Sequence, residues 1–220
     1  MKALIGTGVI GSMLQQSIQF DCVFNSHSID TINNYKFDSI YCAAPSSNRL
    51  IANNNPSDDL QNIKRLAAAL TKSGAQIILI STVDAFVKTS PYAMNRKFLE
   101  DQVQTLPSYK IVRLPSLVGQ SIKKNILYDI KHNQYIESIN ALDVCQWYPL
   151  ENLIHDMACL EDNTITNFVS EPIVNRLILE EFLPASVGLT KNKNENTYNI
   201  QPYLYSAEAI MGYMKEYFCD

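Results

Sequence analysis

The chain has 220 residues, of which 46% are hydrophobic and 18% are charged, a composition typical of a globular protein. Its 18 basic and 22 acidic residues give a net charge of −4, whereas nucleic-acid binding usually needs a basic face, so we expect no nucleic-acid partner. Every apolar run, such as IILI at 77–80, is far shorter than the roughly 20 residues that a membrane-spanning helix needs. We therefore expect no membrane span, and the length favours one domain with a small appendage.

The cysteines and histidines show neither a disulfide framework nor a metal site. The five cysteines are an odd number, lie far apart and include no CxxC motif, which predicts buried thiols in a reducing compartment. The three histidines share no metal-ligand spacing with any cysteine. We therefore expect a cytoplasmic protein without a bound metal ion.

The first half alternates short apolar runs with segments of helical periodicity, which is the pattern of a parallel sheet built from βαβ units. Strands are predicted over 3–5, 22–24, 39–43, 76–81 and 110–113, and helices around 10–18, 57–73 and 91–104. The second helix has Ser57 or Asp58 as its N-cap candidate and Gly74 as its stop. The third has Ser90 as N-cap before Pro91, so its opening turn includes Tyr92.

After residue 115 the pattern changes to shorter elements. They lie at 123–132, 144–150 and 152–160, followed by a strand-like segment at 166–170 and helices at 175–183 and 206–218. The polar stretch at 190–199 is predicted to be a mobile loop. No linker separates two independent domains, so we expect one structural unit in which residues 116–220 complete the sheet and form a small cap on residues 1–115.

A glycine-rich loop follows the first predicted strand and opens the first predicted helix. Gly6, Gly8 and Gly11 have G-x-G-x-x-G spacing, in which the first glycine allows a tight turn, the second lets backbone approach a pyrophosphate and the third permits close helix packing. The alternative is a merely tight turn, but the context favours a dinucleotide site within residues 1–115. We expect an α/β fold, a Rossmann-type doubly wound parallel sheet, with the cofactor contacting Gly6, Thr7, Gly8, Val9, Ile10 and Gly11.

The second predicted strand ends without the carboxylate that holds the ribose 2′-hydroxyl in many NAD sites. Asn25 and Ser26 follow it, so no charge there repels a 2′-phosphate, and Ser26 can donate a hydrogen bond to one. No arginine follows immediately. We expect NADP or NAD as the cofactor, with a slight preference for NADP, and the alternative is that both residues are ordinary loop residues.

A second cluster contains a hydroxyl, a phenol and a cation. Thr82 ends an apolar strand, and Tyr92 and Arg96 lie four residues apart, which places phenol and cation on one helical face. A fixed positive charge beside a phenol favours the phenolate and suits proton donation in a carbonyl reduction. A hydroxyl such as that of Thr82 can hold the substrate oxygen. The alternative is that Tyr92 only packs at a helix start.

These motifs resemble those of the extended short-chain dehydrogenase/reductase superfamily, in the NAD-dependent epimerase/dehydratase group that acts on nucleotide sugars. The resemblance runs through nearly the whole chain, in GTGVIGSML, YCAAPS, DLQNIKRL, ISTVDAF, YAMNR and RLPSLVG. It implies that Tyr92 is the acid/base and Thr82 its hydroxyl partner, that Asn62 orders a water molecule and that Arg96 binds the ribose. It also implies that the cofactor passes Ala43, Ala44 and Pro115.

The sequence departs from the family pattern at three places. Arg96 stands where the family has a lysine, as in a polysaccharide-linked bacterial subgroup that KKNILYDI and CQWYPLENL also resemble. Tyr92 follows Thr82 by only ten residues, so we expect an open site. Val83 stands where sugar 4,6-dehydratases carry the first of two acids, which leaves ketone reduction or epimerisation as the expected reaction.

Four residues beyond the core are expected to contact the substrate. Lys124 and Asn125, with the neighbouring Lys123, suit a diphosphate, although a charged helix start is more often solvated surface. Trp147 can stack on a base or a sugar, or can pack between cap and sheet. Ser116 occupies a place where the family often has a substrate-binding asparagine.

We therefore expect an NAD(P)-dependent oxidoreductase or epimerase acting on a nucleotide-linked keto sugar. The alternative is a non-catalytic dinucleotide-binding sensor or accessory protein of the same fold, which the short cap, the short loop before Tyr92 and Arg96 favour. The predicted helices at 57–73 and 91–104 can form a four-helix homodimer seam, as in the family.

Overall fold

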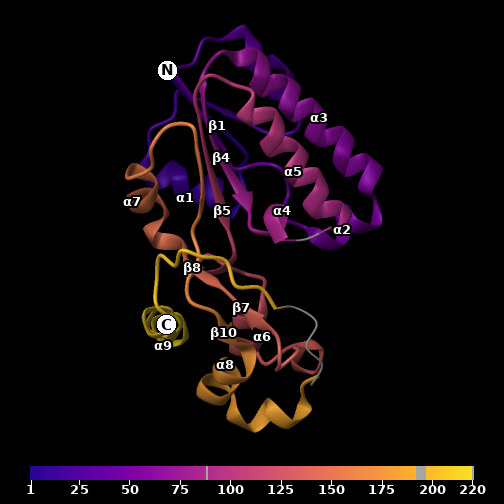
Figure 1. Cartoon of the computed structure of the whole chain (residues 1–220), viewed down its shortest axis with the longest axis vertical. Coiled ribbons are helices and arrows are strands. Elements are labelled where there is room, and N and C mark those ends of the chain that lie inside the picture. The colour runs from indigo at the N-terminus through magenta and orange to yellow at the C-terminus, as the bar shows by residue number, and fades with distance from the viewer. Residues whose placement is uncertain (88, 192–196, 220) are drawn as a thin grey trace. The chain divides into compact units, whose positions relative to one another are not determined.

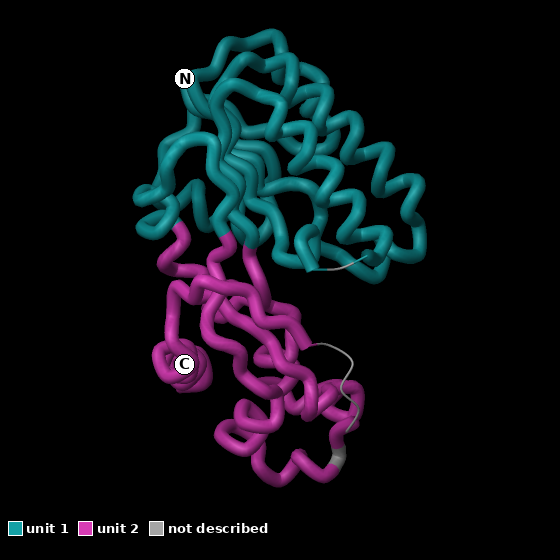
Figure 2. The backbone as a smooth tube through the Cα atoms, viewed as in Figure 1, with its two compact units in different colours: residues 1–113, 154–166 teal, residues 114–153, 167–220 magenta. Residues whose placement is uncertain are grey.

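The computed structural model describes residues 1–87, 89–191 and 197–219 (Figure 1). The chain forms two compact units (Figure 2). The first comprises residues 1–113 and 154–166, and the second comprises residues 114–153 and 167–220.

The first unit is built on a six-stranded sheet in the order β2-β1-β3-β4-β5-β9. These strands are β1 (Lys2–Ile5), β2 (Cys22–Phe24), β3 (Ser39–Cys42), β4 (Gln76–Thr82), β5 (Tyr109–Leu114) and β9 (Thr164–Asn167). β1 pairs in parallel with β2 and β3, so that Ile5 lies opposite both Phe24 and Cys42, and β3 pairs in parallel with β4. The strand order changes direction at β1, and ligands of such doubly wound sheets bind at the carboxyl ends of the strands at that point.

Helices cover both faces of this sheet. α1 (Val9–Ser17) and α7 (Leu153–Ala158) lie on one face, and α3 (Pro56–Ser73) and α5 (Pro91–Gln104) lie on the other (Figure 1). The apolar stripe of α3, with Ile63, Leu66 and Leu70, packs in one core cluster with Leu99 and Val103 of α5. The shorter elements η1 (Ile29–Asn34), α2 (Arg49–Asn54) and α4 (Asp84–Val87) lie in the connections.

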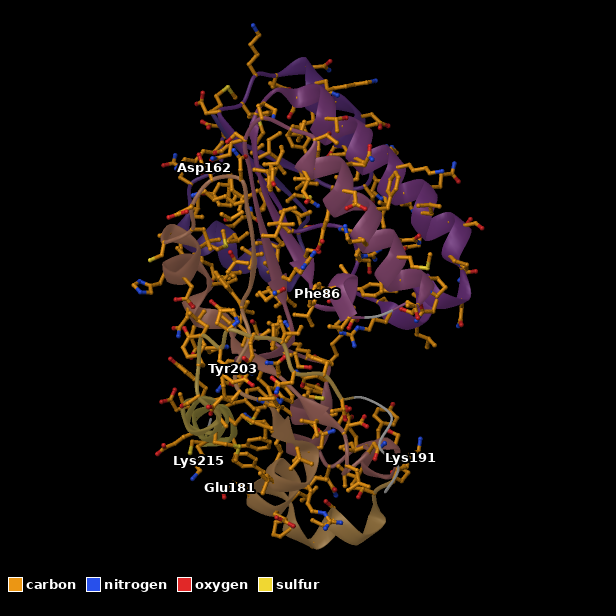
Figure 3. The ribbon with its side chains drawn as sticks, viewed as in Figure 1. Phe86, Asp162, Glu181, Lys191, Tyr203 and Lys215 are labelled. Atoms are coloured by element: carbon orange, nitrogen blue, oxygen red, sulfur yellow. The ribbon has the colours of Figure 1, made fainter. Side chains whose placement is uncertain are left out.

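The second unit has its own core. β6 (Ser116–Val118) pairs in parallel with β8 (Trp147–Pro149), and β7 (Val144–Cys145) pairs antiparallel with β10 (Ile173–Val174). Its helices are α6 (Ile126–Lys131), α8 (Asn175–Phe182) and α9 (Ala207–Cys219), with the short turns η2 (Ile136–Ser138), η3 (Leu150–Asn152) and η4 (Pro184–Leu189). Lys215 of α9 pairs with Glu181 of α8 at 2.9 Å, and both are labelled in Figure 3.

The α/β fold class and the five strands of the first half are as expected, and three helices there have nearly the expected bounds. Ser90 caps α5 as predicted, and its side chain accepts a hydrogen bond from the Ala93 N–H at 3.3 Å. Gly74 ends α3 in a left-handed conformation, with φ of +67°. The N-cap of α3 is Asn55 and not Ser57 or Asp58, because Pro56 already occupies the first turn.

The organisation of the second half differs from the expectation of one structural unit. The change of unit falls at residue 114, close to the expected boundary, but residues 154–166 return to the first unit. Their strand β9 completes the main sheet, whereas the remaining residues form a separate core. Half of the predicted mobile loop at 190–199, residues 192–196, lies outside the described residues.

The cysteines correct another expectation. All five are free thiols, but Cys159 and Cys219 are exposed, and only Cys42 is fully buried. Burial raises the pKa of the Cys42 thiol to about 12. Among the described residues, no three metal-binding side chains gather in one place, and no helix has the length and apolar character of a membrane span.

Candidate functional site

The glycine-rich loop connects β1 to α1, and its three glycines differ in their surroundings. Gly6 has φ of +99°, and a Cβ on it would lie 2.7 Å from the Ala43 carbonyl oxygen. A Cβ on Gly11 would lie 2.0 Å from the Gly6 carbonyl oxygen, so only glycine lets α1 pack this closely. A Cβ on Gly8 would meet no protein atom within 4 Å. Packing therefore requires Gly6 and Gly11, whereas Gly8 faces open space.

This open space lies at the N-terminus of α1. Gly8 is the N-cap residue, no side chain caps the helix, and its first turn holds no acidic residue. Thr7 and Val9 are exposed and Ile10 is half-buried beside it. The uncapped N–H groups and the helix dipole favour an anion, so the loop fits the pyrophosphate of a dinucleotide.

A basic residue that the sequence prediction missed, Arg65 of α3, lies beside the turn after β2. The Asn25 side chain shapes this turn by accepting hydrogen bonds from the N–H groups of His27 and Ser28. The Ser26 carbonyl accepts a hydrogen bond from Arg65 of α3 at 2.9 Å. Arg65 also pairs with Asp30, and its hydrogen bonds hold the pKa of that carboxyl below its usual range. A cation therefore lies beside Ser26, although it comes from a distant helix.

Two of the expected cofactor residues at the end of β3 lie next to the glycine loop. Ala43 donates its N–H to the Ile5 carbonyl at 2.8 Å and packs against Gly6, and Ala44 follows it. Both alanines are half-buried at the point where the strand order changes direction. The third, Pro115, is a buried residue of the second unit.

Thr82 lies at the carboxyl end of β4 and is 8% exposed. Its Oγ1 accepts a hydrogen bond from the Asp84 N–H at 3.2 Å, which fixes the hydroxyl at the start of α4. This acceptor role orients the threonine O–H for donation to another oxygen. Phe86 of the same short helix is exposed and labelled in Figure 3.

Tyr92 and Arg96 are in contact, as their helical spacing predicts. The guanidinium of Arg96 lies over the face of the Tyr92 ring. The guanidinium carbon of Arg96 lies 4.3 Å from the centroid of the Tyr92 ring. Its Nη1 and Nη2 donate to the two carboxylate oxygens of Asp59 on α3 at 2.8 and 3.1 Å. Nη2 also donates to the Ser46 carbonyl at 2.7 Å. Both Tyr92 and Arg96 are buried, at 5% and 4% exposure.

The asparagine predicted to order a water molecule lies on the surface of α3. Asn62 is exposed, one turn after Asp59. The asparagines in the Tyr92 region are Asn53, whose Oδ1 accepts the Tyr92 N–H at 2.9 Å, and Asn95, whose Nδ2 donates to Asp59 at 2.8 Å. Neither was singled out from the sequence, because both contacts join residues far apart in the chain.

A fully buried ion pair supports the strand that carries Thr82. Glu100 of α5 is 0% exposed and accepts two hydrogen bonds from Nε of Arg113 on β5, at 3.0 and 3.1 Å, and one from its Nη2 at 2.6 Å. Its Oε1 also accepts the Ser81 hydroxyl at 2.5 Å. The pair therefore ties α5 and β5 to the residue just before Thr82.

Two of the expected substrate residues, Lys124 and Asn125, lie at the start of α6 in the second unit. The Asn125 side chain makes its hydrogen bonds within the protein. Its Oδ1 accepts from the N–H groups of Leu127 and Tyr128, and its Nδ2 donates to the Leu117 carbonyl. Lys124 is exposed and Ser116 is half-buried on β6. Asn125 is thus the N-cap of α6.

Trp147 was expected to stack on a ligand or to fill a seam between cap and sheet. Its side chain is 1% exposed and belongs to the core cluster of the second unit, with Val118, Leu127 and Ile173. Its ring therefore offers no free face for a base or a sugar. The prediction of stacking is corrected to a core role, because the large apolar ring on the short strand β8 is buried in this small core.

Scans of protein-family models and of curated proteins find no match to this chain. Solved structures do match. dTDP-4-dehydrorhamnose reductase from Yersinia enterocolitica gives a TM-score of 0.70 at 14% identity, covering 99% of this chain and 98% of that one. UDP-glucose 4-epimerase from Thermus thermophilus, in complex with NAD, gives 0.69 at 13% identity, covering 96% and 92%. RMD from Pseudomonas aeruginosa, in complex with NADPH, gives 0.67 at 12% identity, covering 98% and 92%.

These similarities extend over nearly the whole of both chains. The chain therefore has a Rossmann-type α/β fold. More narrowly, its fold is the one seen in these epimerase and reductase structures.

Proposed function

We propose that the chain is an NAD(P)-dependent reductase or epimerase that acts on a nucleotide-linked keto sugar. The observation that carries the proposal is the glycine loop, in which Gly6 and Gly11 are required by packing and Gly8 faces open space at the uncapped start of α1. Similar structures hold NAD or NADPH, and one was solved with UDP-glucose. The dinucleotide, when bound, supplies or accepts the hydride.

The protein's own part in the reaction is to hold the sugar oxygen and to move a proton. Thr82 donates its hydroxyl to that oxygen, because its Oγ1 already accepts the Asp84 N–H. Tyr92 donates or accepts the proton at its phenol. Arg96 acts as a positioning residue, since its terminal nitrogens bind Asp59 and Ser46 and its plane supports the Tyr92 ring. Substitution of Arg96 therefore affects the chemistry through the placement of Tyr92.

The cofactor part of the proposal favours NADP. Arg65 lies beside Ser26, where the ribose 2′-position is expected, and a guanidinium is well suited to bind a 2′-phosphate. Lys124 and Ser116 stay in the proposal as substrate contacts of the second unit. The resemblance to the polysaccharide-linked subgroup adds three points to the proposal. The protein is cytoplasmic, it acts in polysaccharide biosynthesis, and it forms a homodimer through α3 and α5.

Tyr92→Phe tests the catalytic part. It should abolish turnover of keto nucleotide sugars while leaving dinucleotide affinity nearly unchanged, because the phenol acts chiefly in the chemical step. Initial rates with a panel of keto nucleotide sugars and calorimetric titration with NADPH and NADH measure the two effects. Turnover that survives in Tyr92→Phe excludes Tyr92 as the acid/base.

A second candidate function is a non-catalytic dinucleotide-binding sensor or accessory protein. The observation in its favour is that both terminal nitrogens of Arg96 already hydrogen-bond Asp59 and the Ser46 carbonyl. Dinucleotide binding without turnover on the whole panel would select this function. If the protein binds neither dinucleotide at millimolar concentration, both functions fail.

A further inference from the structure

Asp84 is a buried carboxylate, and only one of its two oxygens has a partner among the described residues. It lies in the first turn of α4, two residues after Thr82, and is 3% exposed. Its Oδ1 atom is buried and has no hydrogen-bond partner among the described residues. A buried acceptor that stays unsatisfied is unfavourable for folding, so such an atom points to a partner supplied by a ligand.

Its ion-pair partner, Arg49, lies on the first turn of α2. The Nε atom of Arg49 lies 2.7 Å from Oδ2 of Asp84. The Arg49 side chain is 55% exposed, whereas the Asp84 side chain is 4% exposed. Its guanidinium carbon lies 5.9 Å from the centroid of the Tyr92 ring. The pair thus combines a buried acceptor with a solvent-accessible cation at the proposed acid/base.

The ion pair of Arg96 with Asp59, also beside Tyr92, is different. Asp59 receives hydrogen bonds from both terminal nitrogens of Arg96 and from Asn95. The Arg96 side chain is as buried as the Asp84 side chain, at 4% exposure, and its pair is closed to further partners by this geometry. Of these two ion pairs, only that of Arg49 with Asp84 combines an accessible donor with an unsatisfied acceptor.

A hydroxyl group matches such a pair because it donates one hydrogen bond and accepts others. A phosphate matches less well, since its oxygens only accept and would face the Asp84 carboxylate. We propose that Arg49 and Asp84 bind one hydroxyl of the substrate sugar, close to the sugar oxygen at which Tyr92 moves the proton. The hydroxyl donates to Asp84 Oδ1 and accepts from Arg49. This inference rests on the proposed function, and it makes the substrate a polyhydroxylated sugar whose hydroxyl pattern is read at α2 and α4.

The test compares binding of UDP-glucose and dTDP-glucose with that of their 2-, 3-, 4- and 6-deoxy analogues. Titrations use the whole chain with NADPH present, and the variants are Asp84→Asn and Arg49→Met. The native protein should bind one deoxy analogue about 10- to 100-fold more weakly than the parent, as expected for a hydrogen bond to a charged group. Each variant should bind the parent nucleotide sugar more weakly by a similar factor. Its affinity for that deoxy analogue should equal the affinity of the native protein.

Lys97→Met is the matched control, because Lys97 forms an exposed ion pair with Asp101 on the outer side of α5. It should keep the native selectivity. Thermal unfolding and NADPH affinity of each variant show that the fold and the cofactor site are intact. Where Asp84→Asn does not fold, Arg49→Met gives the same test, because its side chain is half exposed.

Equal losses for the parent and every analogue in both variants would overturn the inference, since the pair would then act on the fold of the site and not on a hydroxyl. Unchanged selectivity in the variants would also overturn it. In both cases a native protein that binds NADPH and turns over a keto nucleotide sugar leaves the proposed function standing. A native protein that binds neither dinucleotide nor nucleotide sugar overturns both.

Discussion

Replacing Asp59 by asparagine should destabilise the first unit, because it leaves the guanidinium of Arg96 without its carboxylate. The side chains of Arg96 and Asp59 are 4% and 13% exposed, and two hydrogen bonds join them. Removing one partner of a buried ion pair costs about 3–5 kcal/mol of unfolding free energy. Asparagine keeps one acceptor oxygen and Asp59 is not fully buried, so we expect the lower end of that range, about 3 kcal/mol.

Urea unfolding followed by circular dichroism measures this loss directly. For a chain of this size, about 3 kcal/mol corresponds to a fall in Tm of about 6–12 °C. The double variant Asp59→Asn with Arg96→Met should lose less than the two single variants added together, with a coupling of about 2 kcal/mol. Asp101→Asn is the control, because its exposed pair with Lys97 on the same helix should contribute less than about 1 kcal/mol.

A structural role of Arg96 is refuted if Asp59→Asn unfolds like Asp101→Asn. It is also refuted if Arg96→Met weakens dinucleotide binding strongly while Asp59→Asn leaves both binding and stability unchanged. That second pattern would mean that Arg96 leaves Asp59 and contacts the ribose when the cofactor binds. Arg96→Lys separates the effects further, because a lysine keeps the charge but cannot form two parallel hydrogen bonds with Asp59.

Gly8→Val should abolish dinucleotide binding in calorimetry, because its side chain would block the pyrophosphate, but Tm should change little, because a Cβ there meets no protein atom. Gly11→Ala should lower both the dinucleotide affinity and Tm, because its Cβ would lie 2.0 Å from a backbone oxygen. Arg65→Ala should weaken NADPH at least tenfold more than NADH, and equal losses for the two would refute a role at the 2′-phosphate. Native Cys42, with its pKa raised to about 12, should resist alkylation at pH 8 while Cys159 reacts, as peptide mass spectrometry would show.

The features that could be predicted from the sequence are those set by neighbouring residues. The loop from Gly6 to Gly11 depends on one strand, one turn and one helix, and all three are local. The ends of α5 and α3 also follow local chemistry, since Ser90 precedes a proline and Gly74 adopts a left-handed conformation. The contact between Tyr92 and Arg96 is equally local, because four residues make about one helical turn.

The partners of these residues could not be predicted, because they depend on how α3 packs against α5 and against η1 with the turn before it. Asp59 lies 37 residues before Arg96, and Arg65 lies 39 residues after Ser26, so no spacing rule joins them. Trp147 is a case of a different kind, because its type and position suited both a stacking platform and a core. Only its burial in the second unit decides between them.

The charges around Tyr92 combine a contact that the local sequence predicts with contacts between residues far apart in the chain. From the sequence, Tyr92 has one cation beside it and would be treated as a phenol next to a lone positive charge. In the fold, two arginines face its ring, from α2 and α5, and each is paired with a carboxylate, from α4 and α3. The field at the phenol is therefore that of two dipolar pairs, which falls off faster with distance than that of a free cation. A ligand that draws Arg49 away from Asp84 would change this field more than one that touches Arg96, because the Asp59 pair is fixed by more hydrogen bonds. In the proposed function, the accessible pair of Arg49 and Asp84 therefore links substrate recognition to proton transfer at Tyr92.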